Sequence, residues 1–277
     1  MSDLEQRLAA IYASPTYCLA EDDLAFMESD AARAERLALE FMRTDLYLRA
    51  QRIASTVVVF GSARIRSPEQ ARRALQELER PDAPKSPELL RRARKALEYS
   101  RYYEEARIFA RVLSENAPQG PMHELAIVTG GGPGIMEAAN RGASEANAPS
   151  IGFNIRMGIP QGPNPYLTPN LAFSFHYFAL RKMHFLLRAR ALVAFPGGYG
   201  TLDELFESLN LIQTRTIDPI PIVLVGREHW ERAVSLDYLL EEGFIDERDR
   251  SLVTVFDSGE EAARYILKIC TKGPFNG

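Results

Sequence analysis

The sequence predicts an α/β fold, a doubly wound (Rossmann-like) parallel sheet with helices on both faces and an N-terminal helical extension. Seven short apolar or β-branched runs alternate with helical patterns, which is typical of strand–helix–strand units. Two of the expected strands end in glycine-rich turns that lead directly into helices. Ligands bind beyond the carboxyl ends of the strands in such a sheet, so we expect both turns at its ligand-binding edge.

The expected strands are apolar along most of their length, which is typical of strands buried on both faces of a parallel sheet. In chain order they cover residues 56–60, 125–129, 150–155, 171–175, 191–195, 221–226 and 252–256. The helix before the fifth strand is expected over about 178–190. A loop rich in Pro and Gly at 158–170 is of the kind that borders a binding site.

Two segments lie outside this alternation and define the expected domain organisation. Residues 1–52 form an N-terminal helical arm, because apolar residues recur at helical spacing between about 21 and 49. Residues 53–277 form the Rossmann-like domain, which carries a helical insertion at about 66–97. Prolines at 81, 84 and 87 mark a break in this insertion, and a long helix is expected from about Pro87 onward.

Composition excludes several classes of function. The 33 Lys and Arg against 37 Asp and Glu give a formal charge of -4 without a dense basic block, so no nucleic-acid partner is expected. Cys18 and Cys270 form no C-x-x-C pair, so neither a disulfide framework nor a thiolate zinc site is indicated, which fits a reducing, cytoplasmic location. No apolar stretch approaches the length that spans a bilayer, and no membrane partner is expected.

The most informative motif is PGGYGTLDE at 196–204, which joins the fifth strand to a helix. Backbone amides of Gly197, Gly198 and Gly200 at a helix N-terminus would bind an anion such as a phosphate, and the Thr201 hydroxyl would add a donor. Glu204 follows one turn into the helix. In the alternative interpretation Thr201 and Glu204 form a capping box, with the carboxylate directed at its own helix.

The second glycine turn, at 130–134, follows the second strand. Gly131, Gly132 and Gly134 would contribute to the same phosphate site, or would only allow the helix to pack closely on the strand. The spacing is G-x-G-x-G rather than that of a dinucleotide fold, and no acidic residue follows at about 20 positions. Binding of NAD or FAD is therefore disfavoured.

A carboxylate beside a bound phosphate needs positive charge between them. The helix over 178–190 offers Arg181, His184 and Arg188 at three- and four-residue spacing on one face, and Lys182 adjoins them. The alternative for these residues is a solvated helix face.

Three motifs together resemble the LOG family, phosphoribohydrolases that release cytokinin bases from nucleotides: GGGPGIMEAAN at 130–140, LRKM at 180–183 and PGGYGTLDE at 196–204. The resemblance covers about residues 56–268. It implies hydrolysis of the N-glycosidic bond of a nucleoside 5′-monophosphate, AMP or a related or cytokinin nucleotide, to free base and ribose 5-phosphate. It also implies a homodimer or higher homo-oligomer, and neither a cofactor nor a metal ion is needed.

The resemblance also assigns roles to particular residues. Arg181 and Glu204 match the family's catalytic Arg and Glu. Lys182 and the glycines of both turns are expected to bind substrate, and Glu137 would bind the ribose hydroxyls or cap its own helix. Members are often labelled lysine decarboxylases, but Lys182 beside Arg181 gives no physical reason for a pyridoxal phosphate aldimine.

This chain differs from the short members of the family in its N-terminal arm and its insertion, and so resembles the larger bacterial relatives. A rival interpretation is a non-catalytic carrier of a nucleotide or of molybdenum cofactor, which would need the glycine cradle but not Glu204. A third is a structural module whose arm and insertion serve assembly. The base is not determined by the sequence, since its recognition would fall to loops such as 161–170.

Overall fold

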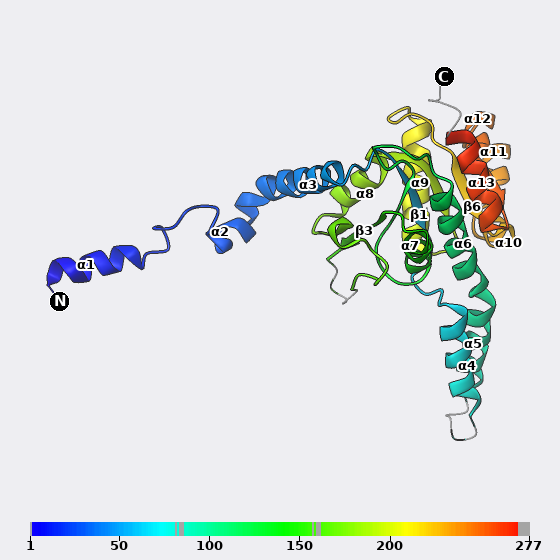
Figure 1. Cartoon of the computed structure of the whole chain (residues 1–277), viewed down its shortest axis with the longest axis horizontal. Helices are drawn as coiled ribbons and strands as arrows, with labels where there is room; N and C mark the ends of the chain where they lie inside the picture. The colour runs from blue at the N-terminus through cyan, green and yellow to red at the C-terminus, as the bar shows by residue number, and fades with distance from the viewer. Residues whose placement is uncertain (1, 81, 83–85, 157, 159–161, 271–277) are drawn as a thin grey trace. The chain divides into compact units, whose positions relative to one another are not determined.

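The computed structural model describes residues 2–80, 82, 86–156, 158 and 162–270. The expected α/β fold is confirmed: seven parallel strands form one sheet in the order β4-β3-β2-β1-β5-β6-β7, with helices around it (Figure 1). The strands are β1 (Thr56–Phe60), β2 (Ala126–Thr129), β3 (Ser150–Ile155), β4 (Ala172–Phe175), β5 (Ala189–Ala194), β6 (Ile222–Val225) and β7 (Val253–Phe256). Their bounds lie within one or two residues of those expected.

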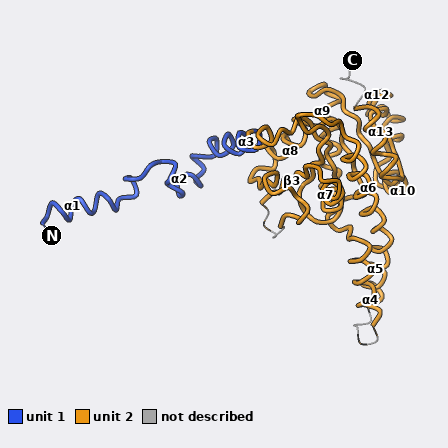
Figure 2. The backbone as a smooth tube through the Cα atoms, viewed as in Figure 1, with its two compact units in different colours: residues 1–45 blue, residues 46–277 orange. Residues whose placement is uncertain are grey.

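The chain divides into two compact units, Met1–Asp45 and Leu46–Gly277 (Figure 2). The first contains α1 (Asp3–Tyr12), α2 (Leu24–Glu28) and the larger part of α3 (Arg33–Ala50). Helix α1, which the sequence pattern did not predict, begins at a capping box formed by Ser2 and Glu5. Among the described residues, no helix has the length and apolar character that crossing a membrane requires.

Helices cover both faces of the sheet in the second unit. Side chains alternate across a strand, so Val57 and Val59 of β1 join one core while Val58 and Phe60 join the other. The first core is completed by α6 (Arg101–Glu115), α7 (Ile135–Glu145) and α13 (Gly259–Cys270), and the second by α8 (Phe178–Leu187), α9 (Tyr199–Gln213) and α10 (Arg227–Ala233). Helices α11 (Leu236–Glu241) and α12 (Glu247–Ser251) lie between β6 and β7 in the chain.

The insertion forms a helical hairpin of α4 (Pro68–Glu79) and α5 (Pro87–Tyr99), which projects from the sheet in Figure 1. Each helix starts with a serine cap followed by proline, a strong start signal. The expectation of a long helix from Pro87 onward is wrong, because α5 ends at Tyr99, Ser100 is its C-cap residue, and a separate helix, α6, begins at Arg101. The Ser100 hydroxyl donates to the Leu97 carbonyl at 2.6 Å, closing the last turn of α5.

The helix before the fifth strand is also shorter than expected. It ends at Leu187, and Ala189 already belongs to β5, where it pairs with Thr56 of β1. The Arg188 carbonyl accepts a hydrogen bond from the Thr56 amide at 2.8 Å. Pairing with β1 therefore places Ala189 and Arg190 in β5, although the sequence pattern predicted them to be helical. Arg188 therefore does not share a helix face with Arg181.

The sheet order places a topological switch point between β1 and β5. From β1 the chain proceeds through β2 and β3 to β4 on one side, and from β5 through β6 to β7 on the other. Connections from the carboxyl ends of β1 and β5 therefore leave in opposite directions and open a crevice, the usual ligand position in such folds.

Replacing Gly142 by Ala is expected to destabilise the protein, because the added methyl group would overlap the Arg107 carbonyl oxygen where α7 packs against α6. Overpacking costs roughly 1–3 kcal/mol, more than the ~1 kcal/mol that Ala gains over Gly within a helix. Urea denaturation measures the loss in free energy of unfolding. Gly120→Ala is the control, since the nearest atom to its added methyl lies 4.0 Å away. Equal stability of the two variants would contradict the packing argument.

Candidate active site

A cavity of about 670 Å³ opens at the switch point. Its walls come from segments far apart in the sequence: the loop after β1 at 60–64, the loop after β2, helix α8, and the first turns of α9 at 198–204. Its size suits a small-molecule ligand of nucleotide dimensions. Arg181 and Glu204, the two expected catalytic residues, both line it.

The glycine loop before α9 does not form the capping box that the sequence allows. Gly198 is the N-cap residue, it makes no side-chain cap bond, and its carbonyl accepts the Leu202 amide at 2.9 Å. Thr201 thus lies inside the first turn, with its side chain packed against Gly197 so closely that a Cβ at 197 would clash. The capping-box interpretation of Glu204 is therefore wrong, and its carboxylate is available to the cavity.

Glu204 is only 9% exposed although it carries an ionisable group. Burial raises the pKa of its carboxyl to about 7, while Lys182 and Arg181 act in the opposite direction and the neighbouring acids Glu207 and Asp203 add to the increase. A carboxyl that titrates near neutral pH is able to accept a proton and to release it, which is the usual property of a general acid–base group.

Arg181 projects from the middle of α8 and is largely buried. Its Nε donates to the Phe153 carbonyl at 2.7 Å, and its guanidinium lies 5.3 Å from the ring centre of Phe185. Burial lowers its pKa, and the charge of Glu204 partly reverses that effect. A side chain at position 130 would overlap the guanidinium, so the glycine at the end of β2 leaves room for it.

Lys182, predicted to bind substrate, is engaged in the structure by acids of α9. Its Nζ lies 2.8 Å from Asp203 and 3.0 Å from Glu207. Burial lowers its pKa, but hydrogen bonds to these two carboxylates outweigh the burial and raise it overall. Lys182 therefore joins α8 to α9 and stays protonated beside Glu204.

The glycine cradle is only partly open to the cavity. Gly198 and Gly200 line it, whereas the Gly197 amide donates to His229 Nε2 at 3.4 Å. His184, expected beside Arg181, is 2% exposed and packs against the rings of Phe153 and Phe175. His184 therefore does not contribute positive charge to the cavity.

The other glycine turn serves mainly to position the loop. Gly131 adopts a left-handed φ of 69°, and its amide donates to the Thr129 hydroxyl at 2.9 Å. Asn164 binds the Gly131 carbonyl through its backbone amide and the Gly132 carbonyl through its side chain, at 2.8 and 3.0 Å. Gly131 and Gly132 are buried and are not among the residues that line the cavity with Glu204, so their expected role in phosphate binding stays a prediction.

Gly134 and Glu137 line a neighbouring cavity of about 730 Å³ instead. A Cβ at Gly134 would clash with the backbone of Ser62 and Ala63, which brings this turn against the loop after β1. The Glu137 carboxylate accepts a hydrogen bond from the Tyr103 hydroxyl at 2.7 Å and caps no helix, since α7 begins without a side-chain cap. The expected ribose-binding role of Glu137 therefore stays a prediction.

A buried polar network centred on Asn140 holds the glycine turn, and sequence reasoning missed it. The Asn140 side chain accepts from the Thr129 hydroxyl at 2.6 Å and from Asn164 Nδ2 at 2.9 Å, and it donates to the Ser150 hydroxyl at 2.9 Å. Asn140 is 0% exposed. Its position as a polar residue on the apolar face of α7 was the one signal available.

Sequence reasoning also missed the loop after β1. Ser62 and Arg64 line the cavity, and the Ser62 amide donates to the Pro196 carbonyl at 3.0 Å, joining this loop to the glycine loop. Tyr199, which is 94% exposed at the start of α9, and Phe178 of α8 line the same cavity. The loop after β1 and the glycine loop lie together because β1 and β5 are neighbours in the sheet, and the sequence alone does not reveal that strand order.

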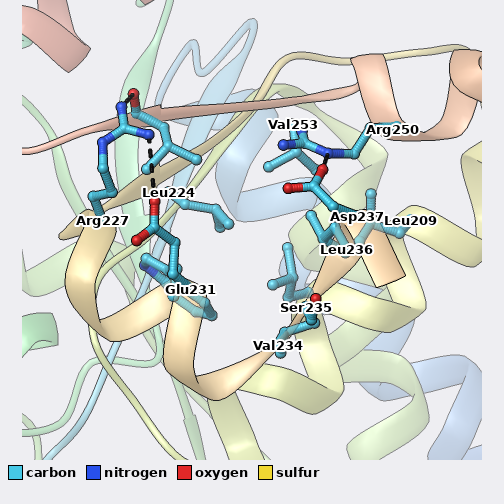
Figure 3. A pocket seen from close by; sticks show the side chains of 13 residues that line it. Leu209, Leu224, Arg227, Glu231, Val234, Ser235, Leu236, Asp237, Arg250 and Val253 are labelled. Atoms are coloured by element: carbon cyan, nitrogen blue, oxygen red, sulfur yellow. Dashed lines mark hydrogen bonds and ion pairs between the residues drawn. The ribbon is translucent and has the colours of Figure 1, made fainter. Parts of the chain in front are cut away.

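Another cavity, of about 220 Å³, lies among α9, α10, α11, β6 and β7 (Figure 3). Its lining mixes apolar and charged side chains, among them the ion pairs of Arg227 with Glu231 and of Arg250 with Asp237. It contains none of the residues expected to carry chemistry. The switch-point cavity is therefore the candidate active site.

Comparison with known proteins shows which sequences and structures this chain resembles. Residues 136–266 match the family model described as "Possible lysine decarboxylase". A pyrimidine/purine nucleotide 5′-monophosphate nucleosidase of Escherichia coli K12 is 28% identical over 158 residues, 53% of this chain and 34% of that protein. A cytokinin riboside 5′-monophosphate phosphoribohydrolase of Arabidopsis thaliana is 33% identical over 88 residues, 31% of this chain and 41% of that protein.

The resemblance to the LOG family is confirmed. The alignments span about a third to two fifths of these curated LOG-type relatives. Among solved structures, a Moco carrier protein from Chlamydomonas reinhardtii superposes with a TM-score of 0.45 at 18% identity, over 79% of this chain and 99% of that chain. A similarity of this degree carries no argument about function. The expected homo-oligomer stays a prediction.

Asn140→Ala is expected to lower the free energy of unfolding by about 2–4 kcal/mol, because it leaves several buried polar groups without partners. Chemical denaturation measures the loss. Asn210→Ala is the matched control, since Asn210 is exposed on α9 and its truncation leaves no buried group unpaired. If both variants were equally stable, the network would not hold the glycine turn.

Glu204→Gln is expected to stabilise the protein above neutral pH. The folded pKa of about 7 lies above the ordinary value of 4.5, so folding favours the protonated carboxyl, and stability falls as the pH rises from 4.5 to about 7. Gln cannot ionise and escapes this loss, which amounts to about 3 kcal/mol. Urea denaturation at about pH 5 and about pH 8 measures it. The exposed Glu241→Gln is the control, and the same pH dependence in the Glu204 variant and the wild type would contradict the assignment.

Proposed function

We propose that this protein hydrolyses the N-glycosidic bond of a nucleoside 5′-monophosphate, producing free base and ribose 5-phosphate. The observation that carries the proposal is the pairing of Glu204 and Arg181 in one cavity at the end of a glycine loop. The carboxylate is not used for capping, and its pKa lies near neutrality. The curated relatives are named for activity on the same class of substrate, nucleoside 5′-monophosphates.

The 5′-phosphate would bind at the N-terminus of α9. The amides of Tyr199 and Gly200 precede the first hydrogen bonds of α9, which the Thr201 and Leu202 amides donate to the Gly198 carbonyl, and the helix dipole favours an anion there. The cations Arg64 and Arg181 line the same cavity and offset the repulsion between phosphate and Glu204. Fixing the phosphate at one end would hold the anomeric carbon near the carboxylate, so binding energy is converted into orientation.

The reaction would proceed through a transition state with oxocarbenium character. The bond between the anomeric carbon and the base nitrogen breaks, and a bond from water oxygen to that carbon forms. Ionised Glu204 would stabilise the positive charge and accept a proton from the attacking water. The departing base takes up a proton, so charge and atoms balance over the whole hydrolysis.

Arg181 would act as a fixed positive charge near the reacting groups. Its hydrogen bond to the Phe153 carbonyl and its position over Phe185 restrict the guanidinium before any ligand binds. A preorganised charge of this kind costs little reorganisation during the reaction. It would either neutralise the phosphate or assist departure of the base.

The description of the family model as a possible lysine decarboxylase finds no support in the site. An amine that forms an aldimine must lose its proton, yet Lys182 is held between two carboxylates that raise its pKa. Its strongest contacts are with α9 rather than with the cavity. The ion pairs of Lys182 with Asp203 and Glu207 are better explained as holding α8 against α9 near Glu204.

Glu204→Gln is expected to lower kcat/KM by about 100-fold or more, the usual contribution of a general acid–base group. The measurement is release of ribose 5-phosphate and free base from a panel of purine, pyrimidine and cytokinin monophosphates. Activity of the wild type should rise with pH through an apparent pKa near 7, as Glu204 ionises.

Glu241→Gln is the control, because Glu241 is exposed on α11 and does not line the cavity. It should keep most of the activity. Binding of every monophosphate without turnover would remove the hydrolase proposal and leave a carrier of nucleotides or of molybdenum cofactor. Full activity in Glu204→Gln would remove the assigned role of the carboxylate.

A further inference from the structure

The neighbouring cavity of about 730 Å³ has the dimensions of a second ligand site. It lies between the helical hairpin α4–α5 and the loop that follows β1. Helix α7 contributes Glu137, and the preceding turn contributes Gly134. None of the chemistry proposed for Glu204 uses this space.

Positive charge dominates the lining of this cavity. Arg64 and Arg66 come from the loop after β1 and Arg92 from α5. Among the described residues, no carboxylate lies within ion-pair distance of Arg64 or Arg66. Arg92 and Arg91 both form ion pairs with Glu88, so one carboxylate is paired with two guanidinium groups.

The acidic residue in the described part of the lining is Glu137, which already accepts the Tyr103 hydroxyl. Three guanidinium groups therefore face one carboxylate. The whole chain carries a formal charge of -4, so this excess of positive charge is local and opposes the average of the protein. Clustered cations repel one another, and an anion in the cavity would relieve that repulsion.

Another part of the lining is apolar and has small side chains. Ala71 and Ala74 of α4 face the cavity together with Ala93 and Ala96 of α5, and Leu78 extends this surface. Alanines on two packed helices leave a shallow floor on which a flat ring system makes extensive contact. The lining thus combines an apolar surface that suits an aromatic group with guanidinium groups that suit an anion.

We propose that this cavity binds a nucleotide carrying two or more phosphates, with its base on the alanine floor and its phosphates on Arg64, Arg66 and Arg92. Arginine binds phosphate oxygens through two parallel N–H donors, and three such groups match a polyphosphate better than a single phosphate. The candidate active site differs, since its glycine loop offers one helix N-terminus for one phosphate.

The two cavities share Ala63 and Arg64 as lining residues. The loop that carries them is tied to the glycine loop by the bond from the Ser62 amide to the Pro196 carbonyl. A polyphosphate on Arg64 would therefore change the charge and position of a group that also faces the monophosphate. Ligands of the two cavities would alter each other's affinity by the same factor. This coupling, unlike the binding itself, rests on the proposed function.

Isothermal titration of the full chain with ATP tests the binding. Arg66→Ala and Arg92→Ala are expected to weaken ATP at least about tenfold, since each removes a charge-assisted hydrogen bond. Arg91→Ala is the matched control, because Arg91 pairs with the same Glu88 but does not line the cavity. Equal ATP affinity in all three variants, or no ATP binding by the wild type, would overturn the proposal.

Two further arms separate this cavity from the active site. AMP at saturating concentration should leave one ATP bound per chain, whereas full displacement of ATP by AMP would mean a single shared site.

Inorganic triphosphate should bind more weakly than ATP, and equal affinity would overturn the role of the alanine floor. The Glu204→Gln variant should bind ATP like the wild type, so the inference stands or falls independently of hydrolysis. Retained AMP binding by Arg66→Ala and Arg92→Ala confirms that both variants are folded.

Discussion

The parallel pairing of β1 with β5 is the constraint on which the candidate site depends. These strands are far apart in the sequence, yet they lie side by side from Thr56 and Ala189 to Phe60 and Ala194. Their carboxyl ends release two loops in opposite directions, toward α4 and toward α9. The bond from Ser62 to Pro196 then fixes the separation of these loops. Without this pairing, Arg64 and Gly198 would have no common cavity.

The electrostatics of the site follow from what the sheet buries. Glu204 lies on the inner side of α9, and burial of its carboxyl opposes ionisation. Lys182 and Arg181, on the adjacent α8, recover part of that cost. The buried Glu204 carboxylate lowers the free energy of unfolding above neutral pH. Ionisable groups that cost stability in this way are typical of functional sites. The hydrogen bonds of Arg181 and the ion pairs of Lys182 keep both cations in place around it.

Glycine has different tasks in the two turns. At Gly197 and Gly130 its value is space, because neighbouring side chains of Thr201 and Arg181 occupy the position of a Cβ. At Gly131 its value is conformation, since φ is positive there. The hydrogen bonds of Asn140 and Asn164 around the second turn explain why it is rigid and closed. The first turn leaves Gly198 and Gly200 exposed to the cavity, and so retains the character of an anion site.

The sequence by itself determined the seven strands and their α/β alternation, because buried strands and glycine turns leave local patterns in composition. Its resemblance to the LOG family predicted Arg181 and Glu204 in one site. It did not determine the end of α8 at Leu187, where pairing of Ala189 with β1 overrides helical periodicity. Nor did it exclude a capping box for Glu204, which depends on α9 starting two residues before Thr201. The loop after β1, the Asn140 network and the cavity of Arg64, Arg66 and Arg92 were settled only by the tertiary structure. Strand order and helix packing bring those residues together across long stretches of chain, and contacts of that range leave no periodic signal in one sequence.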